Sequence, residues 1–389
     1  MAQRVRTDWI LFWTIILLVC LGLVMVFSSS AVMAELKYGK KEPVGSLHFV
    51  SHQLGWAVLS FFVLMYCKRK DYRLLKKPVL AFGSLGVVMA LLIAVYFFDP
   101  DAHRWFRFPL GSIQPSEFAK PALILFMAYF LTRRPDDSIN NRHNLYQATL
   151  VLVFLSLAVV IADLGTAVVL IATAFVVMFA AGLARRYCVV ALIVAFLFGT
   201  TAVAMKPYRL ARVIAFIDQV VGAEPSLAVQ LDPSGRLVRY LTSSEKTRDA
   251  HYQVWQSEIA VGSGGWIGLG LGSGKQKWLF LPEAHTDFIY AIVGEELGLA
   301  GCATILIGFV VILWRGFRLY WTAPDDYGRY LALGVTACIV IQAMFNMSVV
   351  LGMGPTKGIP LPMISNGGSS LLSTLTCLGI LLSVSEQSA

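Results

Sequence analysis

Charged residues are scarce in this sequence. Asp, Glu, Lys and Arg make up only 14% of its 389 residues, whereas hydrophobic residues make up 57%, and the mean hydropathy is +0.69. A soluble globular domain has an apolar share nearer about half. The composition therefore excludes a soluble domain and indicates an all-α polytopic membrane protein.

Metal, disulfide and nucleophile motifs are also missing. The six cysteines are dispersed, mostly within apolar runs, with no spacing that resembles a metal site or a disulfide framework. The sequence contains no HExxH and no Ser, His and Asp arrangement typical of a nucleophilic enzyme. The net charge of +9 could suggest nucleic acid, but in a membrane protein the location of the charge matters more. We expect no nucleic-acid partner.

Long apolar runs predict the topology. With about 20 apolar residues needed to cross a bilayer, we expect ten transmembrane helices, of which the fourth and the last are short. They are centred on 9–29, 50–67, 78–98, 118–132, 145–162, 166–184, 187–205, 286–314, 328–352 and 367–384. An even number places both termini on the same side. Arg4 and Arg6 precede the first run and no small-residue cleavage site follows it, so we interpret it as a retained span.

The basic residues predict the orientation. They gather at the N-terminus and at 68–77, 133–142, 185–186 and 315–329, which share one side if the spans alternate. By the positive-inside rule that side is cytoplasmic. The outer side then holds short loops at 30–49, 99–117 and 353–366 and one long extracytoplasmic loop. The chain thus divides into helices one to seven (1–205), the long loop (206–285) and helices eight to ten (286–389).

The long loop shows three patterns. Apolar residues at helical spacing in 206–218 predict a short amphipathic helix at the membrane interface, with Arg209 and Arg212 on one face. Two alternating runs around the turn residues 232–235 predict a small β-hairpin. The polar stretch 242–248 is interpreted as a linker.

Ionisable residues gather at the outer side of the predicted bundle. Glu283, His285 and Asp287 lie within five residues of one another where the eighth span begins, and Lys275 and Lys277 precede them. Ionisable groups at the mouth of a membrane helix are costly unless they act or find partners. This cluster is therefore the first candidate for chemistry.

Two further positions allow both a structural and a functional interpretation. Glu117 and Lys120 are i, i+3 on the first turn of the fourth span and can pair. Spacing alone favours a structural salt bridge; alternatively, Lys120 holds an anionic ligand and Glu117 orients it. Asp163 interrupts the apolar run between the fifth and sixth spans. It either faces a cavity or a partner or caps the sixth span, and the two readings are evenly balanced.

Glycine and proline mark two irregular segments. The glycines between 262 and 274 match neither a P-loop nor a dinucleotide fingerprint, so tight turns and close backbone packing are favoured. The segment Asn346 to Ser370 is rich in Pro and Gly and contains Lys357. Irregular backbone at membrane depth is tolerated where it lines a cavity. Lys357 would then face that cavity, unless it only snorkels to the interface.

These residues predict one outward-facing cavity with a basic lining and a few carboxylates. The basic residues are Arg104, Lys120, Arg209, Arg212, Lys277 and Lys357. Such a cavity suits a membrane-embedded anionic substrate from the outer leaflet, and a lipid pyrophosphate is the obvious candidate, because cations near the breaking bond stabilise the departing charge. A carboxylate near an acceptor hydroxyl would take its proton.

Several motifs resemble the SEDS family, the polytopic proteins of bacterial shape, elongation, division and sporulation. They are QPSEFAK, DLGTA, PYRLARVIAFID, LPEAHTDFIYAIVGEELGLAG and NxxVxxGxxPTKGIPLPxxSxGGSS, and the likeness extends over nearly the whole chain. PTKG and GEELG resemble the division member more than the elongation member. Two departures are a longer stretch at 220–251 and Asn366, where the family often has Tyr.

The resemblance implies ten membrane helices and a glycosyltransferase that polymerises lipid II into peptidoglycan at the septum of the inner membrane. It implies a class B penicillin-binding protein and other division proteins as partners. It also implies that Asp287 is essential and that Trp105, Glu117 and Lys120 belong to the site.

We hypothesise an inverting displacement with Asp287 as general base. The expected substrate-binding residues are Arg104, Trp105, Glu117, Lys120, Asp163, Arg209, Arg212, Lys277, His285 and Lys357. No cofactor is required. A divalent cation, Mg²⁺ or Mn²⁺, between Asp287 and pyrophosphate is permitted, but no ligand cluster demands one.

Two other functions are compatible with the same cavity. A transporter would move lipid II across the membrane, but such proteins usually show internal repeats with paired broken helices, and no convincing repeat is found. A scaffold would only recruit and activate the penicillin-binding protein, and replacing Asp287 would then leave function intact.

Overall fold

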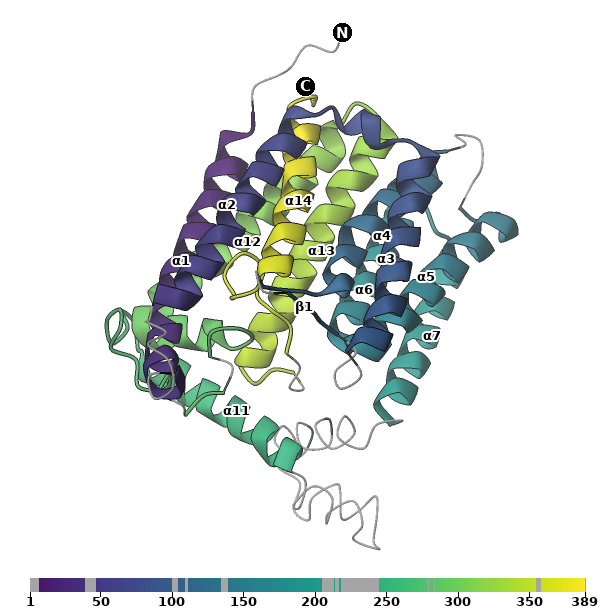
Figure 1. Cartoon of the computed structure of the whole chain (residues 1–389). Coiled ribbons are helices and arrows are strands. Elements are labelled where there is room, and N and C mark those ends of the chain that lie inside the picture. Colours follow the sequence, from purple (N-terminus) through teal and green to yellow (C-terminus); the bar gives the residue numbers. More distant parts are fainter. Residues whose placement is uncertain are drawn as a thin grey trace, which may run out of the picture.

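The computed structural model is a bundle of long helices (Figure 1). It describes residues 7–38, 47–99, 104–108, 111–133, 139–204, 213, 217, 245–278, 280–282, 284–354 and 358–388. The predicted hairpin around 232–235 and almost all of the predicted helix at 206–218 lie outside these residues.

The helices follow the apolar runs of the sequence. They are α1 (Trp9–Tyr38), α2 (Leu47–Arg69), α3 (Pro78–Phe98), α4 (Pro115–Thr132), α5 (Arg142–Ala162), α6 (Leu164–Ala180), α7 (Arg185–Ala204), α11 (Glu245–Ser263), α12 (Ile289–Thr322), α13 (Asp326–Val350) and α14 (Gly368–Ser385), with a short 3₁₀ helix η1 (Tyr72–Leu75). Each of the ten predicted ranges falls on one of these helices. Within the described residues, seven helices (α1, α2, α3, α5, α12, α13 and α14) are long and apolar enough to cross a membrane. The chain is a multi-pass membrane protein, and ten crossings stay a prediction.

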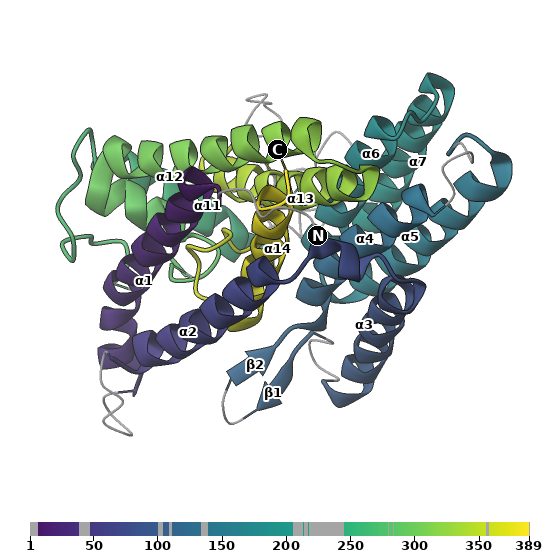
Figure 2. The same cartoon turned by 90° about the horizontal axis from the view of Figure 1, so that it is seen from above.

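The bundle consists of two groups of helices, seen from above in Figure 2. One apolar cluster draws on α1, α2, α12, α13 and α14, and a second one on α3 to α7. Helix α4 contributes to both, through Ile124 and Ala128 to the first and Ala119 and Leu123 to the second. In the most apolar window of α14, 83% of the residues are buried, against 22% in α5. Helix α14 is therefore central, and α5 has its apolar side chains free to contact lipid.

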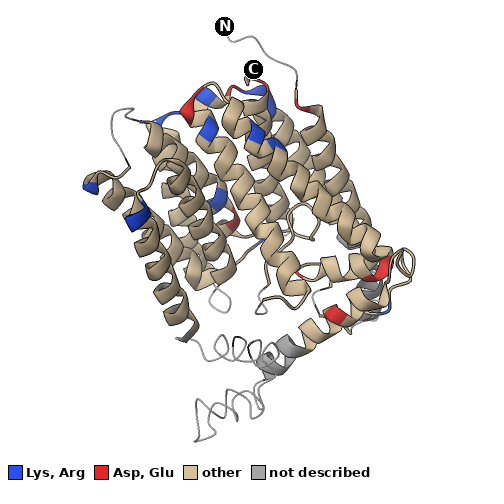
Figure 3. Ribbon diagram, turned by 180° about the vertical axis from the view of Figure 1, so that it is seen from behind, with Lys and Arg blue, Asp and Glu red and all other residues tan. Residues whose placement is uncertain are grey.

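Both ends of the chain meet at one end of the bundle. Thr7 donates to the carboxylate of Glu386 at 2.9 Å, and the backbone N–H of Asp8 donates to Ser385 Oγ at 3.2 Å. Arg315 also pairs with Asp8 at 2.6 Å. This end carries most of the Lys and Arg positions coloured in Figure 3. The predicted common side for both termini is thus confirmed, and its assignment to the cytoplasm by the positive-inside rule stays a prediction.

An acid at this end of the bundle, the predicted cytoplasmic end, caps α13. Asp325 accepts hydrogen bonds from Tyr72 Oη at 2.6 Å, from Arg73 Nε at 3.0 Å and from the backbone N–H of Gly328 at 2.8 Å. Burial alone would raise the pKa of Asp325, but these hydrogen bonds together outweigh it and lower the pKa below its ordinary value. The network ties the connection between α2 and α3 to the start of α13.

We expect Asp325→Asn to destabilise the protein in a pH-dependent way. A folded pKa below the unfolded one stabilises the protein above the unfolded pKa, and this contribution is lost as the pH falls through the folded pKa. Asn still caps a helix, so the loss at neutral pH should be about 1 kcal/mol. Melting in detergent should show the gap to the wild type shrinking below about pH 4. A gap that stays constant down to about pH 3 would contradict the assignment.

Helix α12, on which the eighth predicted span falls, is interrupted by a break. Gly298 has φ 65° and ψ −161° inside α12, a backbone conformation that only glycine adopts easily. A short buried helical segment, 289–297, precedes this break, and the long segment 299–322 follows it. Asp287 therefore lies just before the short segment 289–297, and its position at the mouth of a membrane crossing stays a prediction.

The glycine-rich segment satisfies the backbone groups that the break at Gly298 exposes. The backbone N–H groups of Leu269 and Gly270 donate to the carbonyls of Glu295 and Glu296. After the break, the N–H groups of Leu299 and Ala300 donate to the carbonyls of Gly265 and Trp266. A Cβ on Gly268 or Gly298 would overlap the opposing backbone. The predicted close backbone packing of these glycines is confirmed, and its physical reason is that helix ends at membrane depth need hydrogen-bond partners.

Two local elements differ from the prediction. The stretch 242–248 is not a simple linker, since α11 begins at Glu245. A hairpin of β1 (Phe106–Phe108) and β2 (Gly111–Ile113), with Phe106 opposite Ile113, stands in the 99–117 loop, where none was predicted. The backbone N–H of Gln114 then donates to Ser369 Oγ at 3.3 Å. The hairpin thereby leads the chain into α4 beside the start of α14.

Candidate functional site

The first part of the site is a buried ion pair on α4. Lys120 Nζ lies 2.7 Å from Glu117 Oε2, and the two residues are 4% and 1% exposed. The predicted i, i+3 pairing is confirmed. Ser373 of α14 donates to the backbone carbonyl of Glu117 at 2.7 Å, which joins this turn of α4 to α14. Two charges held this deep between helices are costly unless they are paired, and here each charge neutralises the other.

The second part is an ion pair between the segment just before β1 and the N-terminus of α6. Arg104 lies 3.3 Å from Asp163 Oδ2. Asp163 also caps α6, accepting from the backbone N–H of Gly165 at 2.9 Å and from Thr166 Oγ1 at 2.9 Å. Asp163 therefore has a charged partner and also caps α6, and its contact with a substrate stays a prediction. The Arg104 guanidinium lies 5.4 Å from the ring centroid of Trp105, which places these two predicted residues together.

The third part is the turn that carries Asp287. Three consecutive carbonyls of this turn accept hydrogen bonds from residues more than fifty positions further along the chain. The His285 carbonyl accepts from the backbone N–H of Asn366 at 3.0 Å. The Thr286 carbonyl accepts from Ser365 Oγ at 2.6 Å, and the Asp287 carbonyl from Asn346 Nδ2 at 2.7 Å. The backbone of the turn that carries His285 and Asp287 is therefore held by residues of α13 and of the segment before α14.

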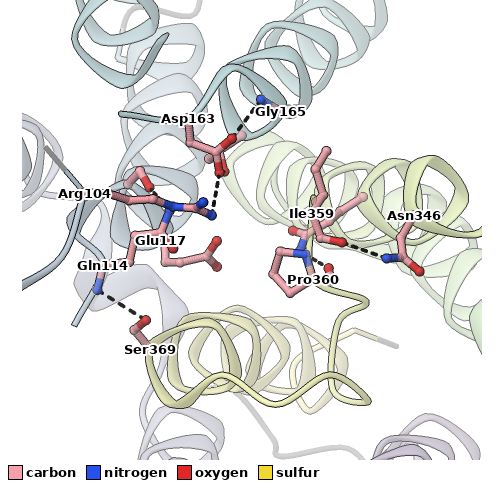
Figure 4. Close-up of polar contacts among 12 residues, drawn as sticks. Arg104, Gln114, Glu117, Asp163, Gly165, Asn346, Ile359, Pro360 and Ser369 are labelled. Carbon is pink, nitrogen blue, oxygen red and sulfur yellow. Dashed lines mark hydrogen bonds and ion pairs between the residues drawn. The ribbon is translucent and has the colours of Figure 1, made fainter. Parts of the chain in front are cut away.

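The loop before α14 packs directly on the Asp287 carboxylate. A Cβ added to Gly358 would overlap Asp287 Oδ2, so this glycine allows the close approach. The next two residues, Ile359 and Pro360, offer their carbonyls to amide side chains of α13. Figure 4 shows Glu117 and Pro360 turned toward one another from opposite sides, with the Arg104–Asp163 pair beside Glu117.

Sequence reasoning missed two buried amides of α13. Gln342 accepts from Lys120 Nζ at 2.7 Å and donates to the Pro360 carbonyl at 2.8 Å. Asn346 donates to the Ile359 carbonyl at 2.7 Å as well as to Asp287. The available signal was two amides spaced i, i+4 in an apolar run, which places them on one helical face.

Lys277, which was predicted to line the cavity, is held in a second buried ion pair, and its contact with a substrate stays a prediction. Its Nζ lies 2.6 Å from Glu296 Oε1 and 3.2 Å from Ser28 Oγ, and the residue is only 4% exposed. Glu296, a fully buried acid that sequence reasoning also missed, accepts from the Gly272 backbone at 3.1 Å. A buried carboxylate without a cation would be costly. Lys277 therefore neutralises Glu296 beside the glycine-rich segment and the break in α12.

The remaining predicted residues differ in what can be said of them. Arg209, Arg212 and Lys357 lie outside the described residues, as does Glu283. No group of three or more His, Cys, Asp and Glu in the described part of the chain is arranged to hold a metal ion, and the divalent cation stays a prediction.

The bundle and its buried charges define a polytopic membrane protein with a polar site between two helix groups. The chain belongs to the FtsW/RodA/SpoVE family of cell cycle proteins, whose family model matches residues 8–389.

Named relatives and solved structures agree with this family. The chain is 37% identical to the probable peptidoglycan glycosyltransferase FtsW of Geobacter metallireducens, covering 98% of this chain and 95% of that protein. It is 35% identical to stage V sporulation protein E of Bacillus subtilis, covering 99% of each. A solved structure described as "Structural coordination of polymerization and crosslinking by a peptidoglycan synthase complex" matches with a TM-score of 0.73 and 26% identity over 98% of each chain. The rod shape determining protein RodA of Thermus thermophilus matches with a TM-score of 0.63 and 25% identity, covering 98% of this chain and 97% of that one.

Proposed function

We propose that this chain is a peptidoglycan glycosyltransferase that polymerises lipid II in the inner membrane, at the division septum. The names of its relatives support the reaction class. The observation that carries the proposal is the hydrogen-bonded connection between the buried Glu117–Lys120 pair and the turn of Asp287. This connection links Lys120, a cation that can bind a phosphate, to Asp287, a carboxylate that can accept the proton of a hydroxyl group.

In this mechanism Lys120 binds the pyrophosphate of the donor lipid. An ammonium group has three N–H donors, and Glu117 and Gln342 accept two of them. The third is available to a phosphate oxygen, and the charge stabilises the pyrophosphate as it departs. Glu117 holds Lys120 charged and oriented. Arg104 and Trp105, which directly precede β1, are proposed to contact the substrate, with Asp163 holding Arg104 in place.

Asp287 acts as the general base. The acceptor hydroxyl oxygen forms a bond to the donor sugar carbon, the bond from that carbon to the pyrophosphate oxygen breaks, and the hydroxyl proton passes to the carboxylate of Asp287. The sugar carbon inverts, as in other single displacements with a base carboxylate. His285 is proposed to position Asp287. Arg209, Arg212 and Lys357 are proposed as further phosphate ligands, and a divalent cation held beside Asp287 would neutralise part of the pyrophosphate charge.

The partner is proposed to be a class B penicillin-binding protein. The similarity to a chain of a peptidoglycan synthase complex that coordinates polymerization and crosslinking supports this choice. Other division proteins are expected to recruit the pair to the septum.

The test is to incubate the purified protein, with and without such a partner, with labelled lipid II. The proposal expects glycan strands, resolved by electrophoresis. Lipid II that crosses vesicle membranes without forming polymer would instead identify a transporter. Strands that require only the partner's own active site would identify a scaffold.

We expect Gly358→Ala to reduce the polymerisation rate about 100-fold, because a small displacement of a reacting group has an effect of this size. The new methyl group would occupy the position of Asp287 Oδ2, and the flexible carboxylate would turn away from it. Unfolding free energy should change by less than about 1 kcal/mol, since only the end of a side chain must move.

Gly354→Ala is the matched control, because a Cβ there meets its nearest atom, Ser348 Oγ, at an ordinary 3.7 Å. This variant should polymerise at the wild-type rate. Equal rates in both alanine variants would show that the packing of Gly358 on Asp287 has no role in the reaction.

A further inference from the structure

Two amide side chains stand one turn apart on the same face of α13. Gln342 and Asn346 are each only 2% exposed, inside a helix that is otherwise mostly apolar. A buried amide is costly unless its polar atoms are hydrogen-bonded. Their N–H groups donate to the consecutive carbonyls of Pro360 and Ile359 at 2.8 and 2.7 Å. The pair therefore fixes the loop that packs Gly358 on Asp287.

Each amide also reaches a different part of the proposed site. The Gln342 carbonyl oxygen accepts from Lys120 Nζ, and the second N–H of Asn346 donates to the Asp287 carbonyl, both at 2.7 Å. Lys120 and the turn of Asp287 are thus each hydrogen-bonded to one of two adjacent turns of α13. Gln342 and Asn346 are four residues apart, so they are separated by about 6 Å along the α13 axis at about 1.5 Å per residue.

We infer that Gln342 and Asn346 are positioning residues that set the placement of Asp287 relative to Lys120. This inference rests on the proposed function. Asn346 holds the base turn and Gln342 holds the phosphate-binding lysine, while both hold the 359–360 loop between them. Catalytic groups must be kept within a fraction of an ångström for full rate, and helices hold such groups better than loops do.

The chemistry of the amide explains why these two residue types are needed. Asn346 uses two donors, and an ionised carboxylate has none. Gln342 uses one donor and one neutral acceptor. A carboxylate at Gln342 would place a second negative charge beside Lys120 and Glu117, and the cluster would then repel an anionic pyrophosphate.

The two amides should have separable kinetic effects. Asn346→Ala and the isosteric Asn346→Asp should both lower kcat about 100-fold with KM for labelled lipid II little changed, because the Lys120 contact is intact. Gln342→Met should raise KM about 10-fold, the equivalent of one hydrogen bond to a charged group. A merely structural role would lower the amount of folded protein and would not separate kcat from KM in this way.

The experiment combines these kinetics with hydrogen–deuterium exchange of the 284–288 segment in the full-length protein. Asn346→Ala should exchange faster there than the wild type. Ser348→Ala is the matched control, since Ser348 donates only within its own helix, to Phe345 at 2.8 Å, and it should match the wild type in exchange and rate. Unchanged exchange in Asn346→Ala, or faster exchange with wild-type kcat, would overturn the positioning role. An Asp287→Asn variant that still polymerises would instead refute the proposed base, while the exchange result would still decide whether Asn346 holds the turn.

Discussion

Asp287→Asn is expected to lower the rate of lipid II polymerisation at least about 1,000-fold, within the range that a general base contributes. The amide keeps the shape of the carboxylate but cannot take the acceptor proton. Folding should be preserved, because the contact that Asn346 makes is with the Asp287 backbone carbonyl and not with its side chain. The measurement is initial polymerisation rate against melting temperature in the same detergent preparation.

Asp325→Asn is the control for this substitution, since it also changes an acid to its amide but at the cytoplasmic end of α13. It should lose some stability and keep its rate. If Asp287→Asn polymerised at the rate of Asp325→Asn, then Asp287 would not be the base, and the scaffold reading would gain support.

Lys120→Met is expected to reduce polymerisation about 1,000-fold, the upper end of the loss for a group that stabilises transition-state charge. It should also destabilise the protein by about 3–5 kcal/mol, because Glu117 would be left as a buried charge without its cation. A loss of activity in this variant alone could reflect misfolding, so a second variant is needed.

The double variant Glu117→Gln with Lys120→Met separates the two effects. Removing both charges at once should restore most of the stability, yet the pyrophosphate would still lack its cation and activity should stay low. The exposed pair of Arg329 and Asp326 has the same i, i+3 spacing at 3.0 Å, so Arg329→Met is a control with little expected effect. A stable double variant that polymerises normally would assign Glu117 and Lys120 a structural role only.

The helices were predictable because hydrophobic length is a local property. Runs of about 20 apolar residues are recognisable without any neighbour, and the ranges 78–98 and 328–352 fall on α3 and α13 nearly residue for residue. The pairing of Glu117 with Lys120 was predictable for the same reason, since helical spacing alone brings the two together. The resemblance to the family singled out Asp287.

The break in α12 was not predictable from its own residues. GEELGLAG is a good helical sequence apart from two glycines, and nothing local distinguishes Gly298 from Gly301. The break is stable only because the glycine-rich segment supplies hydrogen-bond partners from residues far along the chain. The same kind of contact between distant residues pairs Lys277 with Glu296.

The sequence by itself determined that this chain is a helical membrane protein, that its two ends lie on one side, and which acids and bases are unusual for their depth. Tertiary structure alone decided which of those groups act together. Buried N–H groups need acceptors wherever the packing brings them, and the amide N–H groups of Gln342 and Asn346 found theirs in segments that no periodicity connects. As a result, the side chains of Gln342 and Asn346 connect Lys120 to the turn of Asp287, which their sequence positions did not predict.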